Sequence, residues 1–142
     1  MEQLKNVIFY QIEQAIKTYR MYAQKQIKAN GLKITIDQWL VLKSLKENPD
    51  FTQAELAEKV FKDSASITRI LDLLVQSEYV EREINPNDRR KFNLSVTSKG
   101  DSILADTYAV VLQNRKKALE GISENDIQIM SETLKKISKN CK

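Results

Sequence analysis

Hydrophobic residues recur at alternating spacings of four and three over residues 4–29, a stretch without glycine or proline. They are Ile8, Ile12, Ala15, Tyr19 and Tyr22. This period is typical of one face of an α-helix, because side chains three and four residues apart lie on the same side. Gly31 follows, and glycine readily takes the left-handed conformation that ends a helix. The pattern predicts a long N-terminal helix that ends at Asn30-Gly31.

Two shorter helices are predicted from the residues that begin them. Thr35 with Gln38, and Thr52 with Glu55, have the spacing of a capping box. In this motif the two side chains bind backbone N–H groups that the first turn of a helix leaves without partners. Pro49 lies between the two motifs and ends the first of these helices.

A further helix, which we expect to begin after Asp63 or Ser64 and to end near Ser77, has two distinct faces. Its apolar stripe consists of Ile67, Ile70, Leu71 and Leu74. Its opposite face consists of Ser64, Ser66, Thr68, Arg69 and Asp72. A short polar break between two brief helices, the second with small residues leading, is typical of a helix-turn-helix.

Beyond residue 79 the hydrophobic pattern changes to an alternation of every second residue. Phe92, Leu94 and Val96 alternate with polar residues, which indicates a half-buried β-strand. Residues 79–84 are also β-prone, and the Asn-Pro-Asn-Asp sequence at 85–88 has strong turn chemistry. These segments predict a β-hairpin beside the helix-turn-helix.

Two more helices are expected at the C-terminal end. Thr97 or Ser98 begins the first, and Gly121 ends it. Its predicted apolar face consists of Leu104, Tyr108, Val111, Leu112 and Leu119. Ser123 begins the second, whose apolar positions are Ile127, Met130, Leu134 and Ile137. The expected fold class is mostly α with a small β-hairpin, in a single domain over residues 1–142.

Composition excludes several classes of function. The chain has 142 residues, no histidine, one cysteine (Cys141) and three scattered glycines. These counts argue against a histidine-based active site, a zinc site, an internal disulfide and a phosphate-binding glycine loop. No apolar run approaches the ~18 residues of a membrane helix, and no signal peptide is visible. We therefore expect a cytoplasmic protein that is not an enzyme and has no cofactor, metal or membrane partner.

The net charge of +4 is compatible with a polyanionic partner but does not identify one. Residues 62–91 carry six basic and six acidic side chains, so the middle of the chain has no basic excess. Any interaction with nucleic acid must therefore depend on where individual charges lie.

Residues 88–100 (DRRKFNLSVTSKG) resemble the wing signature of the MarR family of transcription factors, which is Asp-x-Arg, alternating aliphatics, Thr and a closing Gly. Residues 66–74 are similar to the recognition helix of that family, and residues 80–82 to the entry of its wing. One departure is Glu78-Tyr79, where the family usually has glycine in the turn before the wing. Another is Val96, where leucine is commoner.

This resemblance implies a winged helix-turn-helix that binds double-stranded DNA. Small residues at the start of a helix let it approach base edges in the major groove, and Ser64, Ala65 and Ser66 meet that requirement. Thr68 offers a further hydroxyl for bases or phosphates, and Arg69 could reach a guanine or a phosphate. Arg89, Arg90 and Lys91 lie at or just after the hairpin tip, where an arginine can enter a narrow minor groove. We favour Arg90 for that role. The resemblance implies that Asp88 forms an ion pair with an arginine and thereby holds the shape of the wing.

The terminal helices lie outside the winged-helix core and need partners for their apolar stripes. A second copy of the chain is the expected partner, which gives a twofold homodimer. The resulting division is a DNA-binding lobe at 33–97 and a helical dimerisation lobe at 1–30 and 98–142. Packing of these helices onto their own domain is the alternative.

Members of this family often respond to small phenolic or aromatic carboxylate ligands. By resemblance, Tyr19, Arg20, Tyr22 and Trp39 are candidates for such a pocket, with Arg20 as the partner of the carboxylate. Phe9, Tyr10 and Tyr108 are further aromatic candidates. Aromatic residues at helical spacing belong to the core more often than to a pocket, so the core is the alternative for each of them. Cys141 lies beside Lys142, whose positive charge would favour the thiolate. A redox-sensing role of Cys141 is therefore a further hypothesis.

We expect the protein to be a sequence-specific DNA-binding regulator, and more specifically a repressor, that binds a palindromic operator. The alternative is a winged helix that serves as a protein-interaction module without specific DNA binding. The neutral middle segment is the best support for that alternative. The two functions differ in what Arg90→Ala does to DNA affinity, which falls only in a regulator.

Overall fold

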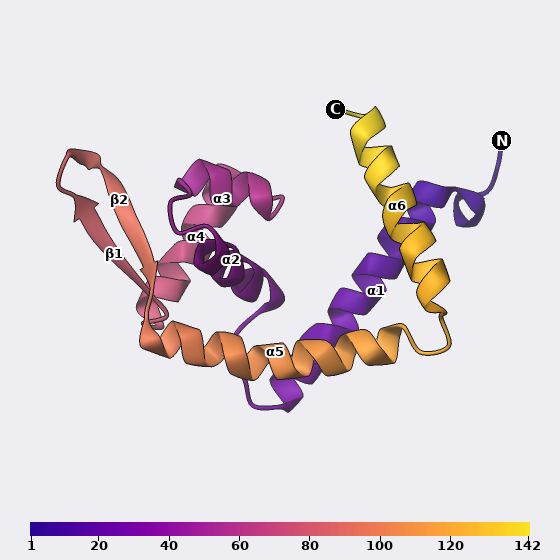
Figure 1. Ribbon diagram of the computed structural model, residues 1–142, viewed down its shortest axis with the longest axis horizontal. Helices are drawn as coiled ribbons and strands as arrows, with labels where there is room; N and C mark the ends of the chain where they lie inside the picture. The colour runs from indigo at the N-terminus through magenta and orange to yellow at the C-terminus, as the bar shows by residue number, and fades with distance from the viewer.

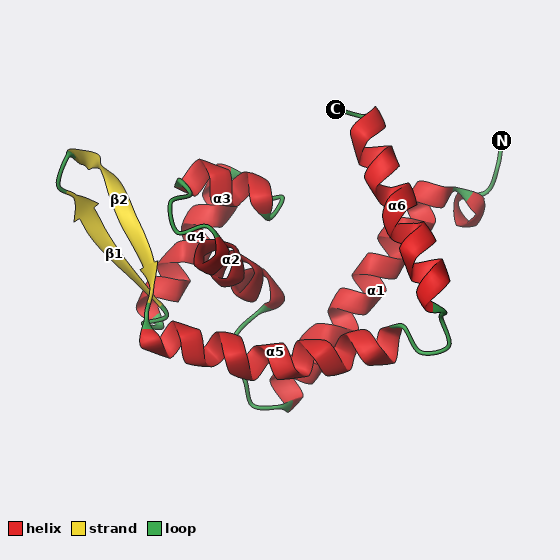
Figure 2. Cartoon of the chain, in the orientation of Figure 1, coloured by secondary structure: helices red, strands yellow, loops and turns green.

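The computed structural model describes residues 1–142, apart from the side chains of residues 89–92. The chain begins with a short 3-10 turn, Leu4–Asn6, and then forms helices and one hairpin (Figures 1 and 2). The helices are α1 (Ile8–Ala29), α2 (Ile36–Glu47), α3 (Gln53–Lys59), α4 (Ser64–Gln76), α5 (Ser98–Ala118) and α6 (Glu124–Asn140). The strands β1 (Val80–Asn85) and β2 (Asp88–Val96) lie between α4 and α5. This order confirms the predicted fold class.

Side-chain caps begin the helices where the sequence predicts them. In α2 the hydroxyl of Thr35 accepts from the N–H of Gln38, and the N–H of Thr35 donates back to the Gln38 side chain, both at 3.0 Å. Thr52 and Glu55 make the same reciprocal pair at the start of α3. Of the two alternatives for α5, Thr97 is the N-cap. Each cap satisfies N–H groups that the first turn leaves unpaired.

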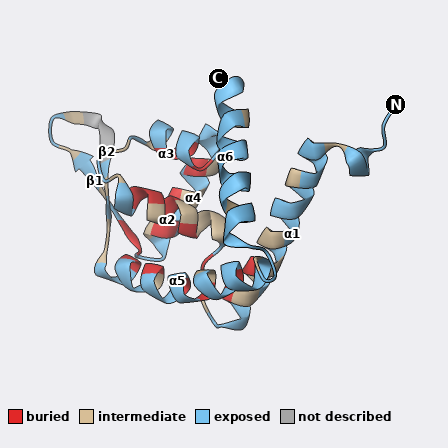
Figure 3. Cartoon of the chain, turned by 45° about the vertical axis from the view of Figure 1, so that its right-hand side comes forward, coloured by how far each residue is buried: buried red, intermediate tan, exposed pale blue. Residues whose placement is uncertain are grey.

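The core lies where α2, α3, α4, the base of the hairpin, the end of α1 and α5 as far as Val110 meet (Figure 3). Its fully buried apolar residues include Val41, Leu42, Leu45, Leu56, Ile67, Leu71 and Leu74. The predicted stripe of α4 is thereby confirmed, with Ile70 half-buried at its edge. The buried stripe fixes which side of α4 faces outward, since the polar residues occupy the opposite side.

The hairpin is a two-stranded antiparallel sheet whose register runs from Val80 opposite Val96 to Asn85 opposite Asp88. Val80 is buried at its base, whereas Ile84, on the same face, extends beyond the core and is exposed. The base is fixed to α5 because the N–H of Thr97 donates to the carbonyl of Tyr79 at 3.0 Å.

The buried face of α5 differs in part from the predicted one. Leu104 is buried as expected, but Tyr108 and Leu112 are 43% and 47% exposed. Thr107 and Asn114 are buried instead, and the Asn114 amide lies 3.5 Å from the carbonyl oxygen of Ala23 in α1. A polar residue, Asn114, therefore lies in the contact between α1 and α5, which an apolar periodicity does not reveal.

The helix α6 has no buried residue, although it carries the predicted apolar stripe. Its partly or largely exposed apolar side chains are Ile127, Ile129, Met130, Leu134 and Ile137. The first half of α1 also exposes Ile8, Phe9 and Ile16. Both helices lie at the end of the molecule opposite the hairpin (Figure 1). No helix among the described residues is both long and apolar enough to span a membrane.

Candidate nucleic-acid interface

The first half of α4 presents a small polar surface. Asp63 is the N-cap of the helix, so the structure selects it over Ser64 for that role. Ser64, Ala65, Thr68 and Arg69 are exposed, and Ser66 is half-buried. The preceding turn includes Phe61, which is exposed and has a positive φ of 61°. All five residues predicted on this helix therefore lie at or near one accessible surface.

The hydroxyl of Thr68 is already partly engaged. It donates to the carbonyl of Ser64 at 2.9 Å and accepts from the Gln53 side chain at 2.6 Å. A hydroxyl has one donor and two acceptor positions, so Thr68 keeps one acceptor position for a ligand. Gln53, the first residue of α3, is thus part of this surface. The sequence does not reveal this role of Gln53, and its position directly after the Thr52 cap is the one signal that points to it.

The N-terminus of α4 already has an anion. The Asp63 carboxylate accepts from the N–H of Ser66 at 2.7 Å. This hydrogen bond, followed by one with the Ser66 side chain, holds the pKa of Asp63 below its ordinary value, with smaller contributions from Arg69 and Lys62. The N–H of Ser66 is therefore not available to a phosphate, which binds at helix ends whose first N–H groups are free.

An ion pair connects the wing to α4. A guanidinium nitrogen of Arg82, in β1, lies 2.9 Å from the carboxylate of Asp72. The hairpin turn is closed by the N–H of Asn87, which donates to the Asn85 side chain at 2.9 Å. Asp88 is half-buried at the start of β2. The side chains of Arg89, Arg90 and Lys91 lie outside the described residues.

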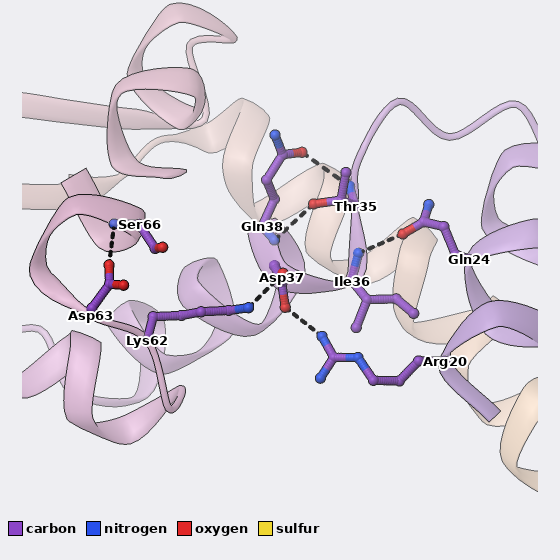
Figure 4. A network of polar contacts seen from close by, with 9 residues as sticks. All are labelled: Arg20, Gln24, Thr35, Ile36, Asp37, Gln38, Lys62, Asp63 and Ser66. Carbon is purple, nitrogen blue, oxygen red and sulfur yellow. Dashed lines mark hydrogen bonds and ion pairs between the residues drawn. The ribbon is translucent and has the colours of Figure 1, made fainter. Parts of the chain in front are cut away.

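Asp37, in the first turn of α2, joins two other parts of the chain (Figure 4). One carboxylate oxygen pairs with Arg20 of α1, and the other lies 3.0 Å from the ammonium nitrogen of Lys62. Gln24 of α1 adds a second link, because its side chain accepts from the N–H of Ile36 at 2.9 Å. The start of α2 is thereby fixed to α1, and Asp37 also contacts the residue before the N-cap of α4.

A cavity of about 180 Å³ lies between α1, α2 and α5. Its lining includes Tyr19, Arg20, Trp39, Leu40, Val111 and Arg115. Three of the four predicted pocket residues meet here, whereas the half-buried Tyr22 does not line this cavity. Trp39 is 6% exposed, and its indole N–H has no hydrogen-bond partner among the described residues. The sequence pointed to Tyr108 of α5, and to Phe9 and Tyr10, but none of these three lines the cavity. The α5 residues that do line it, among them Val111 and Arg115, depend on tertiary packing.

Comparison with known proteins gives a consistent result. Residues 34–92 match the model of the MarR family. The chain is 27% identical over 135 residues to the HTH-type transcriptional regulator MhqR of Bacillus subtilis, covering 95% of this chain and 92% of that one. It is therefore similar to a regulator along nearly its whole length.

Solved structures show the same fold. A cysteine-to-serine mutant of MarR from E. coli, in complex with operator DNA, superposes with a TM-score of 0.80 at 26% identity, covering 89% of each chain. BpsR of Bordetella bronchiseptica, whose DNA binding is regulated by 6-hydroxynicotinic acid, superposes with a TM-score of 0.86 at 17% identity and 97% coverage of each chain. Residues 34–92 therefore resemble the MarR family by sequence, and the likeness to the fold of E. coli MarR extends over the terminal helices as well.

Proposed function

We propose that the protein is a sequence-specific DNA-binding transcriptional regulator that acts as a homodimer and represses transcription. The observation that carries this proposal is the exposed polar surface of α4 beside a hairpin fixed to the same helix by Asp72 and Arg82. When the orientation of the wing relative to α4 is fixed, the two elements form one surface. The helix can then enter the major groove of a duplex while the wing enters the adjacent minor groove.

The proposed contacts in the major groove come from α4. Ser64 and Ala65 have short side chains, so the helix backbone can approach the base edges closely. Ser66 and the remaining acceptor position of Thr68 can hydrogen-bond to bases or phosphates. Arg69 is exposed and has no ion-pair partner among the described residues, so its guanidinium is available to a guanine or a phosphate.

The proposed contacts in the minor groove come from the wing. Arg89, Arg90 and Lys91 follow the turn at residues 85–88 in the sequence. Minor grooves narrowed by A·T pairs carry a strong negative potential, which attracts arginine. We assign the insertion to Arg90, and we assign Asp88 to holding the arginines of the wing in place.

The exposed apolar faces of α1 and α6 support the homodimer. An amphipathic helix gains most of its stability from packing its apolar face, yet α6 has no buried residue in one chain. A second copy can cover both faces through a twofold interface. Residues 1–30 and 98–142 then form a dimerisation lobe, and residues 33–97 a DNA-binding lobe. Two copies of α4 about one DNA turn, roughly 34 Å, apart would recognise a palindromic operator.

We further propose that a small phenolic or aromatic carboxylate compound releases the DNA. The cavity of about 180 Å³ is close in size to an engineered cavity of ~150 Å³ that holds benzene. Tyr19 and Trp39 supply its aromatic walls, and Arg20 and Arg115 supply positive charge. One aromatic ring with a carboxylate matches that combination. BpsR, with its 6-hydroxynicotinic acid, is a relative in fold that responds to such a compound.

Selection from a pool of random DNA duplexes, with the purified protein at physiological salt, tests the function. We expect the wild type to enrich a palindrome. Arg69→Ala and Arg90→Ala should weaken binding to it, and Arg90→Ala should also give a shallower dependence of affinity on salt. Lys17→Ala, on α1, is the control because it removes one positive charge away from the proposed interface.

The alternative, a winged helix that binds another protein, predicts a different result. A folded dimer that enriches no sequence, with equal affinities for wild type and Arg90→Ala, would contradict the regulator and support a protein-interaction module.

A further inference from the structure

We infer that Asp37 is a positioning residue that transmits occupancy of the cavity between α1, α2 and α5 to the DNA-reading helix α4. The inference rests on the proposed function and adds the route by which a ligand changes DNA affinity. Asp37 holds Arg20 on one side and Lys62 on the other. An anionic ligand in the cavity pairs with Arg20 and thereby draws it away from Asp37.

Arg20 has two roles in the same place. Its side chain lines the cavity, and its guanidinium forms an ion pair and a hydrogen bond with Asp37. Both side chains of that pair are only about one-third exposed, at 38% for Arg20 and 35% for Asp37. A partly buried ion pair is screened by water and salt less than a surface pair. A carboxylate ligand therefore competes directly with Asp37 for the same guanidinium.

The charges around Asp37 favour this competition. One carboxylate faces two cations, Arg20 and Lys62, so Arg20 can leave while Asp37 keeps a partner. The cavity also contains Arg115, which has no ion-pair partner among the described residues. An anion that enters the cavity thus meets two guanidinium groups, and only one of them is already paired.

Lys62 connects the bridge to α4. It directly precedes Asp63, whose carboxylate caps the helix by accepting from the N–H of Ser66 (Figure 4). The capped turn contains Ser64, Ala65 and Ser66, the residues proposed to approach the bases. Because these residues are adjacent in the chain, a shift in the position of Lys62 acts first on the N-terminal turn of α4, which is the part proposed to contact DNA.

Thermodynamic linkage sets the size and the symmetry of the effect. A ligand changes DNA affinity only by its difference in affinity for the DNA-bound and DNA-free states, and DNA changes ligand affinity by the same factor. Couplings of this kind are usually about 5- to 150-fold. We therefore expect a ligand that takes Arg20 from Asp37 to raise the dissociation constant for DNA by about fivefold or more.

Sodium benzoate, one aromatic ring with a carboxylate, is the probe. Its binding to the DNA-free dimer is measured by calorimetry, and the dissociation constant for the selected duplex is measured with and without saturating benzoate. For the wild type we expect benzoate binding and a rise of about fivefold or more in that constant. Sodium chloride at equal ionic strength is the matched salt control.

Asp37→Asn separates transmission from ligand binding. We expect this variant to bind benzoate at least as tightly as the wild type, because Arg20 no longer has a competing carboxylate. Its DNA affinity should change less than twofold on adding benzoate. A merely structural role would weaken both properties together. Glu47→Gln, which removes the carboxylate of the Lys43–Glu47 pair on the same helix, should keep the wild-type response.

Lys62→Gln provides a second variant that leaves Asp37 and Arg20 in place, and it too should lose the benzoate response. A wild-type response in Asp37→Asn or Lys62→Gln would overturn the inference, as would failure of benzoate to bind the wild type. If the wild type bound no duplex, the proposed function would fail instead. Calorimetry on the wild type and Asp37→Asn would then still test the competition of benzoate with Asp37 for Arg20. Weaker benzoate binding by Asp37→Asn would contradict that competition.

Discussion

Asp72 and Arg82 form an ion pair at 2.9 Å that joins α4, the helix proposed to contact the major groove, to the first strand of the wing. Arg82 is 26% exposed and Asp72 56% exposed, so the pair lies at the edge of the core. Hairpins of only two strands are marginally stable by themselves. The pair therefore helps to set the angle between the two elements proposed to enter adjacent grooves.

Asp72→Asn should reduce discrimination between operator and random DNA. The variant loses the tether of the wing, but it also loses a negative charge near the phosphates, which favours binding to any sequence. An exposed pair contributes up to about 1 kcal/mol, so the ratio of specific to non-specific affinity should fall by up to about fivefold. Competition between the selected duplex and random DNA measures that ratio.

Glu83→Gln is the matched control for Asp72→Asn, because it removes a carboxylate from β1 that has no ion-pair partner among the described residues. It should raise both affinities alike. An unchanged ratio in Asp72→Asn would show that the pair does not position the wing.

Gly100→Ala should destabilise the protein although alanine favours helices. A β-carbon at this position would clash with the carbonyl oxygen of Tyr79 and lie 2.8 Å from a methyl carbon of Val96. Overpacking of this kind costs about 1–3 kcal/mol, more than the roughly 1 kcal/mol by which alanine exceeds glycine in helix propensity. Urea denaturation should therefore show a lower free energy of unfolding.

Ser102→Ala, at an exposed position in the same first turns of α5, should be nearly neutral in the same experiment. Equal stabilities of Gly100→Ala and wild type would mean that the hairpin base moves away from α5 at little cost.

Glu78→Gly should stabilise the protein by about 1 kcal/mol. Glu78 has a φ of 66°, which costs a residue with a side chain but not glycine. The lost contact with Lys99, at 3.6 Å between exposed groups, contributes little. The hydrogen bond from Thr97 to the backbone carbonyl of residue 78 remains possible. Thermal denaturation of the variant should show a higher midpoint.

Ser77→Gly supplies the contrast, since Ser77 has an ordinary φ of −79°. There glycine only adds conformational freedom to the unfolded chain and should lower stability. A loss of stability in both variants would show that the left-handed residue is not strained.

The parts of the fold that depend on neighbours in sequence were predictable, and the parts that depend on packing were not. Capping boxes at Thr35 and Thr52 act within four residues, so their spacing alone located two helices. The bridge at Asp37 joins segments far apart in the chain, and no local pattern indicates it. At position 78 the sequence shows only that glycine is absent, whereas the structure shows that the left-handed conformation is kept without it.

The candidate site divides in the same way. The exposed face of α4 follows from the apolar stripe on its other side, so Ser64 and Arg69 could be placed from periodicity. Gln53 reaches Thr68 from another helix, and Arg115 reaches the cavity from α5. These contacts depend on how α3 and α5 pack, which the sequence pattern does not specify.

Leu134→Glu should weaken the proposed dimer. Leu134 is exposed in the single chain, on the apolar stripe of α6. Burial of a leucine side chain contributes about 1.5–3 kcal/mol, and a carboxylate there would have to be desolvated. The dimer dissociation constant should therefore rise about tenfold or more in sedimentation equilibrium. Lys136→Glu, two residues further and on the other side of the helix, should leave it within about twofold.

Asp63→Asn should make stability less dependent on pH in the acid range. The folded protein holds the pKa of Asp63 below 3.8, mainly through the N–H of Ser66, so the ionised carboxylate favours folding. That contribution is fully present above the unfolded pKa and is lost as the pH falls through the folded one. Asparagine caps helices about as well as aspartate but does not titrate. Urea denaturation should therefore give the wild type the higher free energy of unfolding at pH 7, and the difference from Asp63→Asn should shrink as the pH drops below about 4. A constant difference across that range would mean that the charge of Asp63 contributes nothing to the cap.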